Sequence, residues 1–212
     1  MYARREVLRA GATLGLLAAA SPWLHAAVPA GLLARKVPST GEALPVIGAG
    51  TSGSFEVEAG TAEAPVAVPA DGKVLVHLSV WEAQKTELTT RAQAGELGVY
   101  LNPEDNPEQL QGDVNVLKLI AFNFPVFKYG QGYSGAVLLR TRYGFTGDIR
   151  AFGDIWRDQF FYLARCGFTQ FDIKEGKSLE DALNAFADFT IPYQTSADGS
   201  LPVFNRRAAA GA

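Results

Sequence analysis

The chain has 212 residues but only one cysteine and two histidines, and this scarcity excludes several kinds of site. Cys166 cannot form a disulfide within the chain, and one thiolate is too few to hold an iron–sulfur cluster. His25 lies near the N-terminus, which leaves His77 as the only histidine of the remainder. We therefore expect neither a His/Cys metal site nor a Ser-His-Asp triad.

A strong charge of either sign is also missing. The net charge is -3, so we expect neither nucleic acid nor an anionic membrane as a partner. The length and the 48% share of hydrophobic residues suffice for one domain with a substantial core. Cys166 falls near the C-terminus of a predicted helix, where the helix dipole disfavours a thiolate. We therefore interpret it as a packing residue.

Residues 1–30 have the layout of a signal peptide. Residues 1–9 are basic and include Arg4-Arg5, and residues 10–20 are apolar and rich in alanine. The apolar stretch is too short to cross a bilayer, so no integral membrane segment is predicted. The twin arginine is typical of Tat signals, which export folded proteins, and it predicts a periplasmic protein. The alternative is an N-terminal amphipathic helix that is not removed.

Residues 31–57 contain a short apolar run followed by Gly48-Ala49-Gly50-Thr51. Together with the leader, this stretch resembles the opening segment of exported aldo/keto reductases. The resemblance ends before any position at which that family carries catalytic residues, so it implies no reductase activity. Residues 58–71 are rich in Ala, Pro and Glu without periodicity, and they predict a linker between two segments of different origin.

Residues 72–194 predict an α/β domain. Residues 148–152 predict a strand, and Asp154 is a candidate N-cap for the helix after it. This helix presents its apolar residues on one face: Trp156, Phe160 and Leu163. Gly144 and Gly167, each followed by phenylalanine, sit where a left-handed residue would end a helix. The order of helix, Gly-Phe and strand therefore occurs twice, which predicts parallel strands joined by helices.

The other predicted elements continue this alternation. Strands are expected at residues 97–101, 117–124 and 171–174. Residues 74–81 are expected to form either a strand or a strand that runs into the start of a helix. Helices are expected at residues 81–92, 103–117, 134–143 and 179–189. We expect about four βα units in a mainly parallel sheet, which is either a half-barrel or an open sheet. A half-barrel would pair with a partner or a second copy, which would make a homo-oligomer. Residues 195–212, rich in Pro and Ala, predict a tail.

Short motifs spread through residues 71–207 are similar to those of one bacterial family. They include Gly132-Tyr133-Ser134, Arg142-Tyr143-Gly144, Arg157-Asp158-Gln159 and Arg165-Cys166-Gly167-Phe168. On these motifs the segment resembles the domain of unknown function 934 family, whose members are described as oxidoreductases of sulfite reduction. The resemblance implies an accessory or oxidoreductase component of assimilatory sulfite reduction. Such a component would work in the cytoplasm with sulfite reductase or another sulfur-assimilation enzyme. The alternative is a non-catalytic binding module that docks on such an enzyme.

The resemblance supplies no catalytic residue, and the chain departs from the family pattern. Residues 129–132 are Tyr-Gly-Gln-Gly where the family usually has Asp-Gly-Arg-Gly, and Asn123 replaces a usual Asp. Val137 replaces a usual Arg in the following helix. These differences remove charge from one loop and its neighbouring helix. With one cysteine, the chain cannot hold siroheme or an iron–sulfur cluster, so its electrons would come from a partner or a diffusible cofactor.

A candidate anion site lies where a strand ends and a helix begins, at Asp154, Arg157, Asp158 and Gln159. Ligands of βα proteins collect at such positions. Arg150, on the preceding strand, is placed to reach the same rim. This group predicts a site for sulfite, sulfate or phosphate. The alternative is that Asp154 caps the helix while Arg157 and Asp158 form ion pairs with neighbours.

A second candidate is the G-x-G-x-x-G spacing of Gly130, Gly132 and Gly135, which includes Ser134. It follows a strand and opens a helix, and Asp154 comes about 20 residues later, where a ribose-binding acid would sit. The pattern suggests a site for NADP or a flavin nucleotide. The alternative is a flexible turn, because residues 125–129 separate the strand from the first glycine.

Aromatic residues are dense between positions 122 and 162. Most of them are expected in the core. Phe161 and Tyr162 do not share the helical face of Trp156 and Phe160. If they are exposed, they mark a surface for a partner.

Overall fold

The computed structural model describes residues 34–36, 43–45, 47–49, 54–57, 67–173 and 177–209. The predicted leader, residues 1–30, and most of the predicted linker lie outside the described residues. The export signal therefore stays a prediction.

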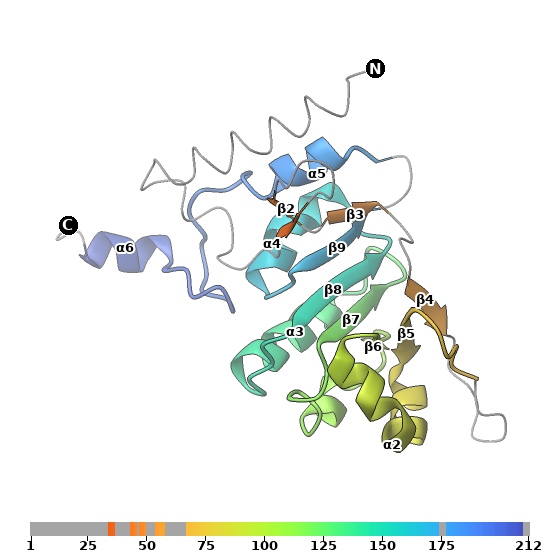
Figure 1. Ribbon diagram of the computed structural model, residues 1–212. Coiled ribbons are helices and arrows are strands. Elements are labelled where there is room, and N and C mark those ends of the chain that lie inside the picture. Colours follow the sequence, from red (N-terminus) through yellow and green to blue (C-terminus); the bar gives the residue numbers. More distant parts are fainter. Residues whose placement is uncertain are drawn as a thin grey trace.

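The centre of the fold is an open, all-parallel β-sheet whose successive strands lie side by side (Figure 1). Its five contiguous strands are β5 (Lys73–His77), β6 (Leu97–Leu101), β7 (Leu119–Phe124), β8 (Asp148–Gly153) and β9 (Gln170–Ile173). β4 (Ser54–Val57) pairs with β5, and β3 (Ile47–Ala49) pairs with β9. The predicted α/β class with a parallel sheet is confirmed. β1 (Ala34–Lys36) and β2 (Ala43–Pro45) form a separate antiparallel pair.

Helical segments follow each of these five strands. They are α2 (Leu78–Ala94), the 3₁₀ helix η2 (Pro107–Leu110), α3 (Gln131–Thr141), the 3₁₀ helix η3 (Arg157–Gln159) with α4 (Phe160–Arg165), and α5 (Leu179–Ala185). A last short helix, α6 (Val203–Ala209), lies away from the sheet (Figure 1). The predicted alternation of strand and helix is therefore present from β5 to the end of the sheet at β9 and α5.

The two faces of the sheet differ in what covers them. One face carries the large core, in which strand residues such as Val76 and Phe122 pack with residues of α2, α3, α4 and α5. The other face carries a small apolar cluster made of strand residues alone: Leu75, Leu119, Tyr100, Ala121 and Phe152. Because no helix among the described residues contributes to this cluster, we call it the helix-free face. Because side chains alternate along a strand, His77 and Asn123 also belong to this face.

The sheet is open but curved. β3 and β4 occupy its two edges, yet only residues 50–53 separate them in the chain. Seven strands side by side in a flat sheet would place the edges about 29 Å apart. The peptide steps from Ala49 to Ser54 reach at most about 18 Å. The two edges of the sheet must therefore curve toward each other.

Two predicted helix ends are confirmed. Gly144 and Gly167 are left-handed, with φ of 69° and 103°. The N–H of Phe145 donates to the carbonyl of Leu139 at 2.8 Å, and the N–H of Phe168 donates to that of Leu163 at 3.2 Å. Both phenylalanines are buried, so each Gly-Phe pair closes a helix and returns the chain to the core.

The predicted helix at residues 103–117 is wrong. The structure has only η2 there, followed by turns. Gly112, Val114 and Asn115 have low helix propensity. The Asp113 carboxylate is buried, where it accepts a 2.8 Å bond from the Trp81 indole and an ion pair from Lys85. These tertiary contacts hold residues 111–116 in turns against α2.

Candidate functional site

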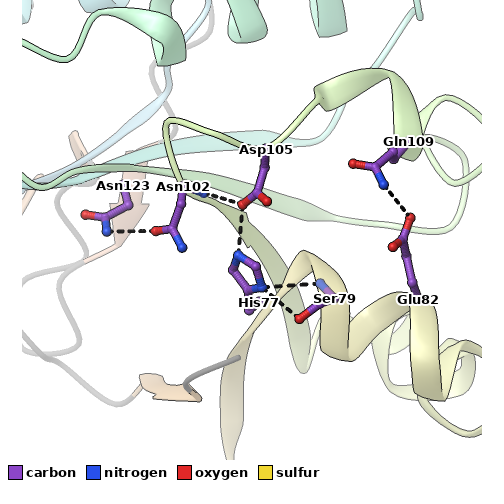
Figure 2. Close-up of polar contacts among 7 residues, drawn as sticks. All are labelled: His77, Ser79, Glu82, Asn102, Asp105, Gln109 and Asn123. Atoms are coloured by element: carbon purple, nitrogen blue, oxygen red, sulfur yellow. Dashed lines mark hydrogen bonds and ion pairs between the residues drawn. The ribbon is translucent and has the colours of Figure 1, made fainter. Parts of the chain in front are cut away.

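Polar side chains meet where β5, β6 and β7 end (Figure 2). His77 is the last residue of β5, Asn102 directly follows β6, and Asn123 is the last residue but one of β7. The carboxyl ends of neighbouring parallel strands lie at one edge of a sheet, where α/β proteins bind their ligands. We call this group, with Ser79 and Asp105, the His77 cluster.

His77 links a hydroxyl to a carboxylate. Its Nδ1 lies 2.9 Å from Ser79 Oγ, and its Nε2 lies 2.8 Å from Asp105 Oδ2. His77 is also the N-cap of α2, because the backbone N–H of Ser79 donates to Nδ1 at 3.3 Å. An N–H can only donate, so Nδ1 is the unprotonated nitrogen. The proton is therefore on Nε2, where it is donated to the carboxylate of Asp105.

The carboxylate is itself held in place. Asp105 Oδ2 accepts the backbone N–H of Asn102 at 2.7 Å, and Asn102 Oδ1 accepts the amide of Asn123 at 3.0 Å. The His77 ring is buried and lies edge-on to Tyr100, with ring centroids 5.1 Å apart. Three side chains thus contact the imidazole directly: Ser79, Asp105 and Tyr100. Such an arrangement is suited to proton transfer, since the carboxylate stabilises the imidazolium that forms.

No Ser-His-Asp triad was expected from the sequence, yet the structure brings a serine, the histidine and an aspartate into hydrogen-bond contact. That expectation rested on the small number of histidines, and one histidine suffices. Asp105 is 28 residues from His77 in the chain, and only the pairing of β5 with β6 brings the two together. The available signal was a histidine at a strand end, a serine two residues later and an acid just after the next strand.

Arg157, predicted to bind an anion, is already paired with acids. Its guanidinium contacts Asp181 at 2.9 Å and Asp188 at 2.5 Å, and this bonding holds the pKa of Asp188 below its ordinary value. An anion at Arg157 would have to displace one of these carboxylates. Asp158 lies beside Arg157 on η3 and is exposed. Anion binding here stays a prediction.

Arg150 points elsewhere. It lies on the helix-free face of β8, where its guanidinium donates to Gln170 Oε1 at 2.7 and 2.9 Å. Burial raises the pKa of Asp172, and the nearby Arg150 opposes this shift. Arg157, by contrast, bonds to α5, which packs on the opposite face of the sheet. Arg150 and Arg157 therefore act on different faces.

The predicted cap at Asp154 is wrong. Trp156 precedes the first turn of η3 instead, and its backbone N–H donates to Gln159 Oε1 at 2.8 Å. The backbone N–H of Asp154 extends the β7 pairing by donating to the Phe124 carbonyl at 2.7 Å. Gln159 is buried and also donates to the Tyr133 hydroxyl at 3.0 Å, which ties η3 to α3.

The glycines of the G-x-G-x-x-G spacing have a packing explanation. A Cβ on Gly132 would lie 2.7 Å from the Phe124 ring, and one on Gly135 would lie 2.6 Å from the Phe122 ring. Gly130 is the N-cap of α3, and Ser134 is exposed on the helix. The glycines let α3 lie close against β7, which does not require a phosphate. Nucleotide binding stays a prediction.

The structure also bears on the sequence interpretations of Cys166 and Tyr162. Cys166 is buried, and burial is the main cause that raises the pKa of its thiol. It is therefore a packing residue and a poor nucleophile. Tyr162 is exposed on α4, and its ring lies 5.3 Å from that of Tyr133.

Large aromatic side chains are exposed on the loops after β7 and β8. Phe127 is 57% exposed and Trp156 is 50% exposed, and Tyr129 lies between them in the chain. Lys177 Nζ lies 5.2 Å from the centroid of the Trp156 ring. We call the two loops that carry Phe127, Tyr129 and Trp156 the aromatic loops.

Within the described ranges, no group of His, Cys, Asp and Glu has the arrangement of a metal site. No helix in this part of the chain is long and apolar enough to cross a bilayer.

Comparison with known proteins places the chain in a family. The family model for a bacterial protein of unknown function (DUF934) matches residues 98–204, about half of the chain, and the chain belongs to this family. His77 and Ser79 precede the matched segment, whereas Asn102 and Asp105 lie within it. No curated protein matches the chain.

Proposed function

We propose that this member of the family binds a small oxyanion of the sulfite or sulfate class at the His77 cluster. We further propose that it is an accessory or oxidoreductase component of assimilatory sulfite reduction. The site in this proposal comes from the geometry of the strand ends. The process comes from the resemblance of residues 71–207 to a family described in those terms.

The observation that carries the proposal is the convergence of hydrogen-bond donors at one edge of the sheet. Asn102 Oδ1 accepts from Asn123, so the carboxamide nitrogen of Asn102 points away from that bond (Figure 2). Ser79 contributes the hydroxyl of the cluster, which lies 2.9 Å from His77 Nδ1. Carboxamide N–H and hydroxyl groups are neutral donors that suit the oxygens of a small anion. The anion would lie at the ends of β5 and β6, where α/β proteins bind ligands.

A charge reversal at Asn102 tests the site. Asn102→Asp keeps the oxygen that Asn123 bonds, but it replaces the amide donor by a negative charge beside Asp105. We expect sulfite to bind at least tenfold more weakly, because like charges a few ångströms apart in a partly buried site repel strongly. Isothermal titration with sulfite, and with chloride as the reference anion, measures the change.

Asn106→Asp is the matched control. Asn106 caps η2 by accepting the N–H of Glu108 at 3.1 Å, and an aspartate can make the same bond. It carries the same added charge outside the cluster, so sulfite binding should stay near that of the wild type. Equal sulfite affinity of Asn102→Asp and the wild type, or no saturable binding to either, would rule out this site.

The second candidate function is a non-catalytic module that docks on sulfite reductase or a related enzyme. The exposed aromatic loops favour it, because exposed aromatic residues are enriched at the centres of protein interfaces. Trp156→Ser should reduce co-purification with sulfite reductase at least tenfold. Tyr193→Ser, at a residue that is 77% exposed outside the loops, should not. Retention of the reductase by Trp156→Ser would argue against docking through this surface.

Location decides which enzymes are within reach. The leader predicts the periplasm, whereas the resemblance implies the cytoplasm. A role beside a cytoplasmic sulfite reductase requires an uncut chain in the cytoplasm. A chain cut near Ala26 or Ala30 and found in the periplasm would need an exported partner instead.

A further inference from the structure

We propose that Ser79 is a nucleophile and that the His77 cluster is an acyl-transfer site for small carboxylic esters. His77 is the base and Asp105 stabilises its protonated form. This activity goes beyond the proposed function and does not depend on sulfite binding. A nucleophile, a base and an acid that orients the base define such a site by geometry, whatever their order in the chain.

The hydrogen bonds set the imidazole in the form that a base requires. The N–H of Ser79 fixes Nδ1 as an acceptor, and the carboxylate fixes the proton on Nε2. The hydroxyl of Ser79, 2.9 Å from Nδ1, can donate to the same lone pair, which it shares with the longer 3.3 Å bond from the backbone N–H. Ser79 faces Nδ1, which accepts, and Asp105 faces Nε2, which donates.

The exposure of the three groups follows their roles. Ser79 is half-buried. The His77 side chain is 9% exposed and that of Asp105 is 18% exposed, so water has little access to the ion pair that forms during transfer. A desolvated carboxylate stabilises the imidazolium more than one in bulk water.

The place of Ser79 in the fold also suits acyl transfer. It lies in the first turn of α2, directly after β5, and α2 has 17 residues. The N–H of Ser79 donates to His77 Nδ1, but the other first N–H groups of a helix have no carbonyl partner within the helix. A carbonyl oxygen that becomes negative beside Ser79 lies near these donors, which would stabilise it as an oxyanion hole does.

The reaction has two balanced halves. Ser79 Oγ bonds to the ester carbonyl carbon while its proton passes to His77 Nδ1, and the carbonyl π electrons move to oxygen. When the carbonyl re-forms, the bond to the alkoxy group breaks, and that group leaves as the alcohol with the proton from Nδ1. Water then attacks the acyl-Ser79 ester by the same route, which releases the carboxylic acid and restores the hydroxyl.

A fluorophosphonate probe tests the nucleophile on the full chain. We expect one phosphonyl adduct per chain, located on Ser79 by peptide mass spectrometry, with fluoride as the leaving group. Ser79→Ala should give no adduct. His77→Gln should label at least 100-fold more slowly, since a positioned base contributes about 10²- to 10⁴-fold.

Ser178→Ala is the matched control, because Ser178 is exposed at the start of α5, where its hydroxyl accepts the N–H of Asp181 at 3.2 Å and faces no histidine in the part of the chain that the structure describes. It should label at the wild-type rate. Folded wild-type protein that stays unlabelled would overturn the proposal and leave His77 as a helix cap only. The same holds if folded His77→Gln labels Ser79 at the wild-type rate. Sulfite titration is a separate readout, so the two proposals fail independently.

Discussion

Arg165→Met is expected to lower the free energy of unfolding by about 3–5 kcal/mol, which is the usual cost of removing one partner of a buried ion pair. Arg165 is buried, and its Nε donates to Asp198 Oδ2 at 3.0 Å. It also donates to the carbonyl of Gln194. The substitution would leave the Asp198 carboxylate buried without its cation. Urea unfolding followed by circular dichroism measures the loss.

Two variants make this result specific. Adding Asp198→Asn to Arg165→Met should recover part of the stability, because the uncompensated charge is removed. Arg157→Met removes an arginine that also contacts carboxylates but lies at the surface. It should shift the unfolding midpoint little, since water and salt screen such pairs. If Arg165→Met were no more destabilising than Arg157→Met, the buried pair would not hold the C-terminal segment.

Arg140→Met is the second large effect, with an expected loss of about 3–5 kcal/mol from orphaned carbonyl groups. Nη1 of Arg140 donates to the carbonyls of Phe145 and Gly147, at 2.8 and 2.7 Å. Nε and Nη2 both donate to the carbonyl of Gly167, at 3.0 and 2.9 Å. One guanidinium therefore ties together the two loops that lead into β8 and β9. Burial of this half-buried side chain lowers the pKa of Arg140.

Arg140→Lys separates geometry from charge. A lysine keeps the positive charge but cannot reach three carbonyls with one ammonium, so most of the loss should remain. Arg142→Met is the control, because Arg142 is exposed two positions further on, and it should be nearly neutral. Thermal and urea unfolding of the three variants measure the order. Full stability of Arg140→Lys would show that charge alone holds the loops.

The fold could be predicted where local signals decide it. The two Gly-Phe helix ends are local, and they led directly to parallel strands joined by helices. The helix prediction for residues 103–117 was wrong because the conformation there depends on a distant contact. Trp81, 32 positions earlier in the chain, donates a hydrogen bond to Asp113. Helix propensity could not show this contact. The curvature of the sheet was equally out of reach, since it follows from which strands occupy the two edges.

The candidate site could be predicted only in its general position. The sequence placed ligand binding at the carboxyl ends of the strands, but it favoured β8, whereas the His77 cluster lies at β5, β6 and β7. The acids that pair with Arg157 are 24 and 31 residues later in the chain, beyond any local pattern. The glycine spacing was misleading for another reason. Glycine serves a close helix-to-strand contact as readily as a phosphate, and only the Phe122 and Phe124 rings distinguish the two.

The order of the strands has a consequence for how the chain folds. From β5 to β9, every strand pairs with the one that precedes it in the sequence. Each new strand therefore pairs with a neighbour 20 to 29 residues earlier in the chain, so the loop to be closed is of similar size at every step. During synthesis, each βα unit can join a sheet edge that is already formed as it leaves the ribosome. The domain can thus grow in one direction, like a solenoid to which repeats are added at one end.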